Sequence, residues 1–432
     1  MTAPTIADIN LNDAEMFMEG RFHDALRVIR NEDPVHWNPG DERVNGFWAI
    51  TKAEDVRFIS RNPELFISGN GIAGPGIRPE ALAELMQTDP ANAAQATGGN
   101  ASIITMDPPR HVKMRRLINK GFTPRAVNLM EPEIRRITGQ ILDRIAKKGE
   151  VDFVVEVASQ LPLAVICGMM GLEEKDWGLM FELTNKVLGS GDPEYQTDVP
   201  EAERGTGAAA RQTAMTGFGT MFAYFRERLE ERRANPREDD LISILLEAEL
   251  DGEKLTEMDL LQFCFLLIVA GNETTRNAIS GGLQVLCEHP DQKAKLLADM
   301  SLLDSAIEEI LRWVSPVHHM ARTVTSDVEL RGKTLKAGDR LIMWYGAVNR
   351  DEDIFLDPYK FDITRTPNDH LAFGIGEHFC LGSGFAKKEL RVMFEELFRR
   401  FPDIEMSGPP ERLRSNFING IKHLPVRYTP EG

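Results

Sequence analysis

The stretch FGIGEHFCLG, residues 373–382, decides how the rest of this sequence is interpreted. Gly374 and Gly376 allow the backbone to turn sharply, and Cys380 follows just before an amphipathic run that predicts a helix over residues 383–400. The N-terminus of that helix would favour the thiolate form of the cysteine, because a helix N-terminus carries partial positive charge. The sequence therefore predicts a reactive or metal-binding thiolate at Cys380.

Three roles are open to this thiolate. A nucleophile would need a base, which His378 or His370 could supply, and a zinc ligand would need three protein partners. A haem ligand needs no other protein ligand, because the porphyrin supplies four nitrogens. Haem ligation fits best, because no CxxC pair occurs among the cysteines, which are Cys167, Cys264, Cys287 and Cys380.

The pattern FGxGxHxCxG over residues 373–382 resembles the haem-thiolate signature of the cytochrome P450 family. The resemblance implies that Cys380 is the metal ligand of haem b and that His378 faces a haem propionate. It also implies that the loop turns its backbone N–H groups toward the sulfur, which would tune the thiolate. The remaining cofactor-binding residues expected in this loop are Phe373, Gly374 and Gly382.

A second decisive feature is the run from Thr256 to Pro290, which predicts a helix of about 32 residues and about 48 Å. Its centre, AGNETT at residues 270–275, is unusually polar and could be a seam against another helix. The motif also resembles the distal-helix motif of the same family. The resemblance implies that small residues leave room for dioxygen over the haem and that an acid–alcohol pair delivers protons. The residues concerned are Ala270 and Gly271 for the cofactor side, and Glu273 and Thr274 for catalysis.

Glu309 and Arg312 resemble the ExxR pair of the family, and residues three apart share a helix face. Most such pairs are weak surface ion pairs, whereas the resemblance implies a structural role in the core. The family usually completes this cluster from a PxRF segment, but this chain has PYKF at residues 358–361. Either Lys360 or Arg365 is therefore expected to complete the cluster.

Three further residues are candidate cofactor ligands. His111 and Arg115 lie four residues apart in a segment, residues 106–125, that resembles the helix at the haem edge. Arg322 follows SPVHHMA and resembles another propionate-binding arginine. The resemblance implies that these residues bind the two propionates, whose negative charges need cationic donors.

The expected substrate pocket draws on several segments. The Gly-rich residues 68–102 predict a lid or binding loop. His318 and His319 are expected either to hydrogen-bond a polar group of the ligand or to face solvent. The predicted substrate-binding residues are Val269, Ala270, Val317, His318 and Phe417.

The periodic patterns predict a mainly α-helical chain with small, mostly antiparallel β-sheets. By resemblance, this is the cytochrome P450 fold, with an α-rich and a β-rich lobe in a single domain over residues 1–432. Strands are predicted at residues 46–52 and 327–344, and a tail hairpin at 417–428 turns at Asn419-Gly420. Helices are predicted at residues 125–148, 173–188, 207–234 and 292–313.

Charge and hydropathy exclude several classes of protein. The net charge of −17 argues against a nucleic-acid-binding protein. The longest strongly apolar stretch, residues 263–271, is far shorter than the roughly 20 residues of a membrane span, and residues 1–17 lack the pattern of a secretory signal. We therefore expect a cytoplasmic monomer without a membrane span.

The resemblance implies a monooxygenase that uses O2 and electrons from NAD(P)H. The electrons would arrive through a separate ferredoxin and its reductase, because the sequence has no fused flavin or iron–sulfur segment. The expected substrate is a hydrophobic terpenoid, steroid or branched lipid. A fatty-acid hydroxylase, a peroxide-using haem enzyme of the same fold, a non-catalytic haem protein and a cysteine hydrolase are the alternatives. A basic patch for an acidic electron donor is expected from Lys113, Arg116, Lys120, Lys387 and Lys388.

Overall fold

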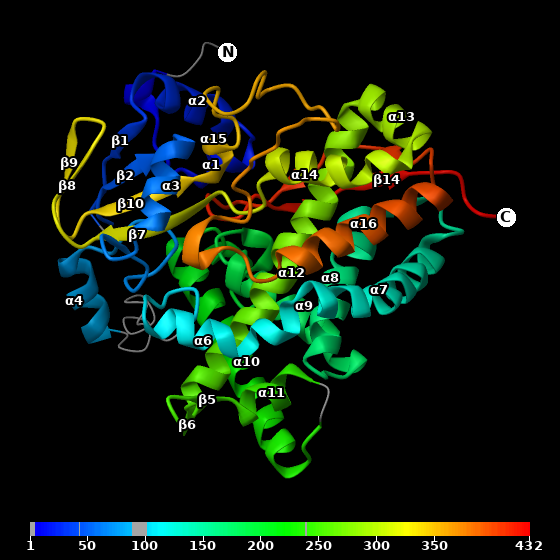
Figure 1. Ribbon diagram of the computed structural model, residues 1–432, viewed down its shortest axis with the longest axis horizontal. Helices are drawn as coiled ribbons and strands as arrows, with labels where there is room; N and C mark the ends of the chain where they lie inside the picture. Colours follow the sequence, from blue (N-terminus) through cyan, green and yellow to red (C-terminus); the bar gives the residue numbers. More distant parts are fainter. Residues whose placement is uncertain (1–4, 43, 89–101, 238–239) are drawn as a thin grey trace.

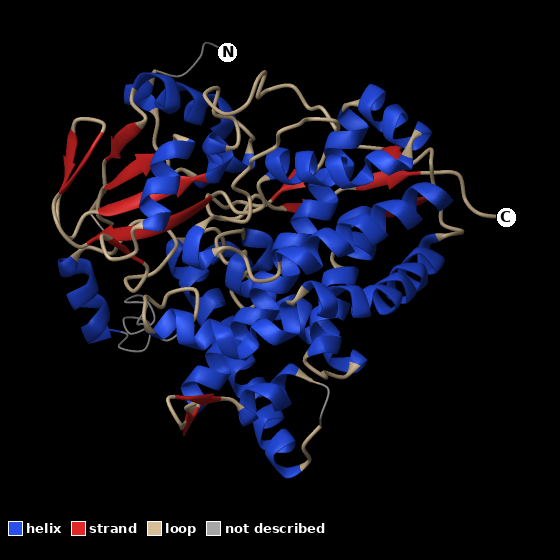
Figure 2. Cartoon of the chain, in the orientation of Figure 1, coloured by secondary structure: helices blue, strands red, loops and turns tan. Residues whose placement is uncertain are grey.

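A computed structural model describes residues 5–42, 44–88, 102–237 and 240–432 of the chain. The largest sheet lies in one lobe of the molecule together with a few helices, and most helices, with several short strands, make up the other lobe (Figures 1 and 2). This arrangement confirms the predicted mainly α-helical fold with small sheets. The α-helices are α1 (Ala14–Met18), α2 (Phe22–Glu32), α3 (Ala53–Arg61), α4 (Pro79–Thr88), α6 (Arg110–Ile118), α7 (Pro124–Ile145), α8 (Gln160–Met169), α9 (Trp177–Leu188), α10 (Gly207–Ala234), α11 (Leu241–Glu247), α12 (Glu257–Glu288), α13 (Pro290–Ala298), α14 (Leu303–Val314), α15 (Tyr345–Val348) and α16 (Ser383–Arg400).

The largest sheet has five strands in the order β1-β2-β10-β7-β3. Its neighbours pair antiparallel except β10 and β2, which are parallel. The predicted strands at 46–52 and 327–344 are confirmed, whereas β1, β3 and β7 were not predicted. These strands are β1 (Val35–Asn38), β2 (Phe47–Ile50), β3 (Phe66–Ile67), β7 (His319–Val324) and β10 (Arg340–Trp344).

The smaller sheets hold the remaining strands. One three-stranded sheet has the order β11-β14-β4, and the other three sheets are two-stranded. The strands are β4 (Glu150–Asp152), β5 (Glu249–Leu250), β6 (Glu253–Lys254), β8 (Val328–Leu330), β9 (Lys333–Leu335), β11 (Glu405–Met406), β12 (Glu411–Arg412), β13 (Ile421–His423) and β14 (Pro425–Arg427).

The predicted long helix is α12, which has 32 residues and runs through the helical lobe (Figure 1). Thr256 and Asp259 form a capping box at its start, and the helix ends before Pro290. Glycines in its second half allow close packing. A Cβ on Gly281 would lie 2.9 Å from the Val314 side chain of α14, and one on Gly282 would lie 2.8 Å from Phe394 of α16.

Two clusters of buried apolar side chains meet along α12. The first half of the helix, with residues such as Leu260 and Ile268, belongs to one cluster. The second half, with Ile279 and Leu283, belongs to the other. The polar residues 270–275 lie between these two clusters, so the unusual centre of the helix coincides with a change of packing partner.

Two predicted elements differ from the structure. The helix expected at 292–313 is divided into α13 and α14, because Asp299 is extended and its side chain accepts a hydrogen bond from Ser301 N at 3.0 Å. The predicted turn of the tail hairpin, at Asn419-Gly420, was also wrong. Neither Asn419 nor Gly420 has the positive φ that a two-residue turn requires, and β13 pairs with β12 across a longer loop.

Candidate active site

The loop before α16 has the sharp turn that the sequence predicted. Gly374 and Gly376 have φ values of +69° and +77°, a region that favours glycine. A Cβ on Gly376 would lie 2.3 Å from the Ser60 carbonyl oxygen of α3, so the loop packs directly on that backbone. The Cys380 N–H donates to the Phe373 carbonyl oxygen at 2.9 Å, which closes the loop.

The Cys380 sulfur lies in a polarised environment. Burial raises the pKa of the Cys380 thiol, whereas hydrogen bonds from the Gly382 and Ser383 N–H groups and the charge of Arg115 lower it. N–H donors and a cation therefore favour the thiolate at this position, in opposition to the desolvation of a negative charge.

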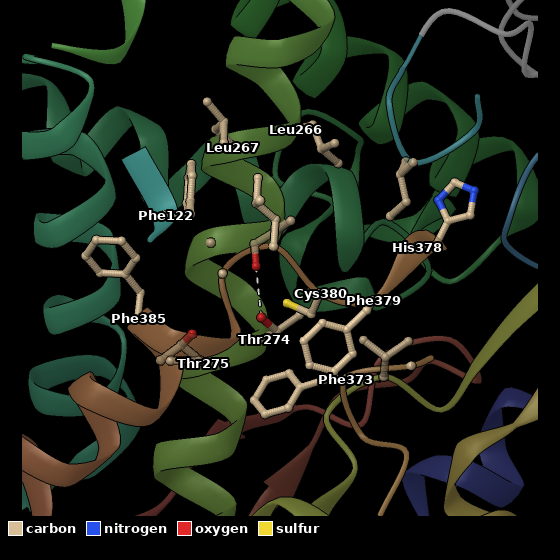
Figure 3. A pocket seen from close by; sticks show the side chains of 18 of the residues that line it. Phe122, Leu266, Leu267, Thr274, Thr275, Phe373, His378, Phe379, Cys380 and Phe385 are labelled. Carbon is tan, nitrogen blue, oxygen red and sulfur yellow. Dashed lines mark hydrogen bonds between the residues drawn. The ribbon is translucent and has the colours of Figure 1, made fainter. Parts of the chain in front are cut away.

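The loop and α12 line one largely apolar cavity, with Cys380 and Thr274 both on its wall (Figure 3). Twelve of the sixteen residues predicted to bind metal, cofactor or substrate or to act in catalysis lie on this wall. They are His111, Arg115, Ala270, Gly271, Thr274, Val317, Arg322, Phe373, Gly374, His378, Cys380 and Gly382.

Sequence reasoning missed most of the apolar lining. These residues come from the segment before α6 and from α8, α12 and β7, where their hydrophobic periodicity looks like that of ordinary core positions. They include Ile103, Ile104, Met169, Leu266, Leu267 and Met320.

The cavity wall carries a group of histidines and cations that fits the propionates of haem. The His111 and His378 rings lie 4.1 Å apart, and burial lowers the pKa of His111 to about 4 and that of His378 to about 2. In the described part of the chain, neither Arg115 nor Arg322 has an ion-pair partner, although Arg322 is 6% exposed. A buried cation such as Arg322 is costly without an ion-pair partner, so a bound dianion would stabilise this group.

Thr274 and Glu273 point in different directions. Thr274 Oγ1 lies on the cavity wall and donates to the Ala270 carbonyl oxygen at 2.8 Å (Figure 3). Glu273 is 1% exposed, does not line the cavity and forms an ion pair with Arg276. Asn277 Nδ2 also donates to Glu273 Oε1 at 3.2 Å.

This ion pair connects α12 to α9. Arg276 Nη1 donates to the Asn185 side-chain oxygen at 2.8 Å. Glu273 Oε2 is buried and has no hydrogen-bond partner among the described residues. The carboxylate therefore keeps one acceptor oxygen available while a buried arginine holds the other.

Gly271 has a packing role that the sequence did not reveal. A Cβ at this position would lie 3.2 Å from Ile166 Cγ1 of α8. The glycine therefore allows α8 and α12 to approach each other, in addition to lying on the cavity wall.

Three predicted substrate-binding residues do not lie on the cavity wall. Val269 is buried among the apolar residues around the first half of α12. His318 is buried between Phe17 and Phe22, with ring centroids 4.8 and 4.6 Å away. Phe417 packs on His319 at 5.3 Å.

The two expected roles of His318 and His319, ligand binding or solvent exposure, were both wrong, because both side chains are buried and off the cavity wall. His319 instead accepts from Gly74 N at 3.1 Å, and its Nδ1 lies 3.0 Å from the Asn416 carbonyl oxygen. Successive side chains of β7 point to opposite faces of the sheet. Met320 and Arg322 face the cavity, so His319, the residue before Met320, faces away from it.

Glu309 and Arg312 are fully buried and form a cluster with Arg365, whose side chain is 9% exposed. Arg312 donates to both Glu309 carboxylate oxygens at 2.7 Å, and Arg365 Nε lies 3.2 and 3.1 Å from them. The Lys360 side chain is 65% exposed and lies 4.0 Å from Asp362. Arg365, not Lys360, completes the cluster.

The described residues include no helix that is long and apolar enough to cross a membrane.

Residues 79–422 match the family model for cytochrome P450. A methyl-branched lipid omega-hydroxylase of Mycobacterium tuberculosis is 40% identical over 98% of this chain and 95% of its own length. A steroid C26-monooxygenase of Mycolicibacterium smegmatis is 35% identical over 100% of this chain and 96% of its own.

Solved structures of other proteins also match this chain closely. A cytochrome P450 of Mycobacterium marinum in complex with pseudoionone superposes with a TM-score of 0.85, 35% identity and 99% coverage of both chains. A Bacillus megaterium relative in complex with testosterone has a TM-score of 0.80 and 33% identity, covering 96% of this chain and 99% of its own. With the cysteine loop, the polar centre of α12 and the paired Glu309 and Arg312 in place, this chain belongs to the cytochrome P450 family of haem monooxygenases.

Proposed function

We propose that Cys380 would be the protein ligand of the haem b that this family uses with O2 and electrons from NAD(P)H. The observation that carries the proposal is the position of the Cys380 sulfur, which lies on the wall of an apolar cavity beside N–H donors and a cation. Cationic and imidazole groups on the same wall would hold the haem propionates. These groups are His111, Arg115, Arg322 and His378.

The haem, when bound, supplies the chemistry by which one atom of O2 enters a C–H bond and the other leaves as water. Thr274 would hold a hydroxyl proton at Oγ1 on the cavity wall, where it can donate a hydrogen bond toward the reacting oxygen. Glu273 would relay protons toward Thr274 through its free Oε2 atom. Apolar side chains around Leu266 and Met320 would exclude bulk water from the site.

The proposed substrate is a hydrophobic molecule with an uncharged end at the reaction centre, namely a methyl-branched lipid, a steroid or a terpenoid. Support comes from the lining, which is aliphatic and aromatic between α8, α12 and β7. The comparisons also support these classes. Two relatives are named for methyl-branched lipids and steroids, and two solved neighbours are in complex with pseudoionone and testosterone.

Charge argues against a free fatty acid that enters carboxylate first. The arginines on the cavity wall are Arg115 and Arg322, and the proposed haem propionates would take both. A fatty acid could still bind with its methyl end inward, so this alternative remains part of the test below. The presence of Glu273 and Thr274 disfavours a peroxide-using enzyme, which has no need for this proton supply.

We further propose that a ferredoxin and its reductase deliver the electrons. Of the five predicted basic-patch residues, Arg116 and Lys120 form no ion pair in the described part of the chain, whereas the other three do. The paired residues are Lys113 with Asp251, Lys387 with Glu308 and Lys388 with Glu131. The single-domain organisation, the monomeric state and the cytoplasmic location stay predictions.

The absorption spectrum of the ferrous protein with carbon monoxide tests whether Cys380 is the haem ligand. We expect the Soret band of a thiolate-ligated haem in the wild-type protein and its loss in Cys380→Ser, with Cys287→Ser as the matched control. A band typical of imidazole ligation in the wild type, or a native band in Cys380→Ser, would overturn the proposal.

A panel of steroids, terpenoids, methyl-branched lipids and straight-chain fatty acids then tests the substrate class through the spin-state shift of the ferric Soret band. We expect shifts with the first three groups. A shift with straight-chain fatty acids alone would instead establish the alternative.

A further inference from the structure

Residues 70–76, between β3 and α4, contribute one side chain to the cavity wall, that of Ile72. The structure describes this whole segment, and it contains no helix or strand. Contacts with β7 and β10 of the largest sheet set its path instead. The Ala321 N–H of β7 donates to the Ile72 carbonyl oxygen at 2.8 Å, at the residue whose side chain reaches the cavity. The position of this part of the wall therefore depends on how the sheet holds the segment.

Two buried side chains bind the backbone of Gly74. Its N–H donates to His319 Nε2 at 3.1 Å, and its carbonyl oxygen accepts from Arg340 Nε at 3.2 Å. Arg340 Nη1 also donates to the Asn70 carbonyl oxygen at 3.1 Å. Asn70 and Gly74 lie two residues before and two residues after Ile72, so the segment is fixed to the sheet on both sides of this side chain.

His319 binds Gly74 as a neutral imidazole with one defined tautomer. Its Nδ1 atom lies 3.0 Å from the Asn416 carbonyl oxygen, which can only accept, so Nδ1 carries the proton and Nε2 accepts from Gly74. The side chain is buried, and burial lowers the pKa of the imidazole to about 3. Ring contacts with Trp344 at 4.7 Å and Phe417 at 5.3 Å hold its orientation. The acceptor for Gly74 is therefore rigid.

Arg340 is a buried cation whose donors go to uncharged oxygens. It is 7% exposed and forms no ion pair with a described residue, and burial lowers the pKa of its guanidinium to about 10. Besides the carbonyl oxygens of Asn70 and Gly74, it binds Thr323 Oγ1 at 3.2 Å. These hydrogen bonds offset the cost of burying the charge only while the segment keeps this position.

The two faces of β7 therefore both act on the cavity. Met320 and Arg322 lie on the wall themselves, whereas His319 points to the opposite face and holds the segment that carries Ile72. A change at His319 can consequently alter the wall although this side chain does not touch a molecule in the cavity.

We propose that His319 is a positioning residue for substrate recognition, which together with Arg340 fixes residues 70–76 so that Ile72 forms a rigid part of the cavity wall. The inference rests on the proposed function, because it takes the cavity as the substrate site. A ligand that fills the cavity contacts Ile72, so the position of the segment affects the binding of bulky ligands more than that of small ones.

Hydrogen exchange of the holoenzyme tests whether His319 holds the segment. We expect slow exchange of the Gly74 amide in the wild type and in His319→Gln, because glutamine can accept from Gly74 and donate to Asn416. In His319→Leu, which lacks an acceptor, exchange of this amide should be roughly fivefold faster or more.

The matched control is His318→Leu, which removes a neighbouring buried imidazole that packs on Phe17 and Phe22. Exchange of the Gly74 amide should keep its wild-type rate in this variant. Equal exchange in His319→Gln and His319→Leu would overturn the proposal. An unprotected Gly74 amide in the wild type would also overturn it, and that measurement stands even if the leucine variant does not fold.

Two nitrogen ligands of haem iron test the effect on recognition without a known substrate. Imidazole is small and clotrimazole is bulky, and both shift the ferric Soret band when they bind. We expect His319→Leu to weaken clotrimazole binding by roughly threefold or more and imidazole binding by less than about twofold, with wild-type values restored in His319→Gln. An unchanged affinity for clotrimazole, or equal losses for both ligands, would overturn the proposal.

A double-mutant cycle tests whether His319 acts through Ile72. Ile72→Ala should itself weaken clotrimazole binding, and His319→Leu should add little in that background, whereas independent effects would add. Additive losses would overturn the proposal. A missing thiolate band in the wild-type carbon monoxide spectrum would signal failure of the proposed function instead, since failure of this inference leaves that band intact.

Discussion

Arg365 Nε lies 3.2 and 3.1 Å from the two carboxylate oxygens of Glu309, a partly buried contact between the loop before the cysteine and α14. The guanidinium also donates to the carbonyl oxygens of Leu356, Asp357 and Lys360. Arg365 therefore ties the loop to the buried Glu309, together with the Asp362 N–H and the Asn368 side-chain amide, which donate to the same carboxylate at 3.0 and 3.1 Å.

Removing Arg365 should destabilise the protein strongly. Arg365→Ala leaves the buried Glu309 with one cation in place of two and removes the guanidinium donor from three carbonyl groups. We expect the free energy of unfolding to fall by about 3 kcal/mol. Lys360→Ala changes an exposed side chain and should have an effect within about 0.5 kcal/mol. Urea denaturation of both variants measures the difference, and equal effects would show that Lys360 shares the role.

Gly376 should tolerate no side chain. In Gly376→Ala the new Cβ would lie 2.3 Å from the Ser60 carbonyl oxygen, at a φ of +77° that alanine rarely adopts. We expect loss of haem binding together with a lower free energy of unfolding. Gly338→Ala is the control for backbone strain alone, because Gly338 has a φ of +92° and open space around it. That variant should lose only about 1 kcal/mol and keep its haem. Full haem occupancy in Gly376→Ala would contradict this account.

The sequence predicted the features that depend on local pattern. The limits of α12 followed from the capping box at Thr256 and the proline at 290, and the turn at Gly374 and Gly376 followed from glycine spacing. Motif resemblance then selected the part of the cavity wall that carries Cys380, Thr274 and the cationic groups. The resemblance predicted a residue's position correctly where that position depends on a short segment.

Long-range packing could not be predicted in the same way. The place of His318 between Phe17 and Phe22 depends on α1 and α2, which are distant in the sequence. The choice of Arg365 over Lys360 depends on how the loop folds over Glu309. The value of Gly271 for packing against Ile166 also appears only when α8 is placed beside α12.

The ion pair between Glu273 and Arg276 should contribute both to the free energy of unfolding and to the supply of protons to the active site. Arg276→Met leaves Glu273 buried without its cation, so we expect the free energy of unfolding to fall by about 3–5 kcal/mol. Glu273→Gln retains the shape of the side chain but cannot relay a proton. It should therefore lower product formed per NAD(P)H while haem content stays normal. An unchanged product yield with Glu273→Gln would remove this residue from the proton path.

His319 should make the protein less stable as pH falls below about 6.5. The Gly74 N–H donates to Nε2 of His319, so this nitrogen carries no proton, and burial lowers the pKa of the imidazole to about 3. Between the unfolded pKa of about 6.5 and this folded value, the unfolded chain binds one more proton than the folded chain. The contribution to stability is thus complete above pH 6.5 and decreases by up to about 1.4 kcal/mol for each pH unit below it.

His319→Gln should reduce this slope, since glutamine can accept from Gly74 and donate to Asn416 without titrating. Urea denaturation between pH 4.5 and 7.5 compares the two proteins. His23 and His318 are also buried, and burial lowers the pKa of each well below the usual range, so some slope should remain in the variant. Identical slopes in the wild type and the variant would mean that His319 is already protonated in the folded state or that its burial is relieved before unfolding.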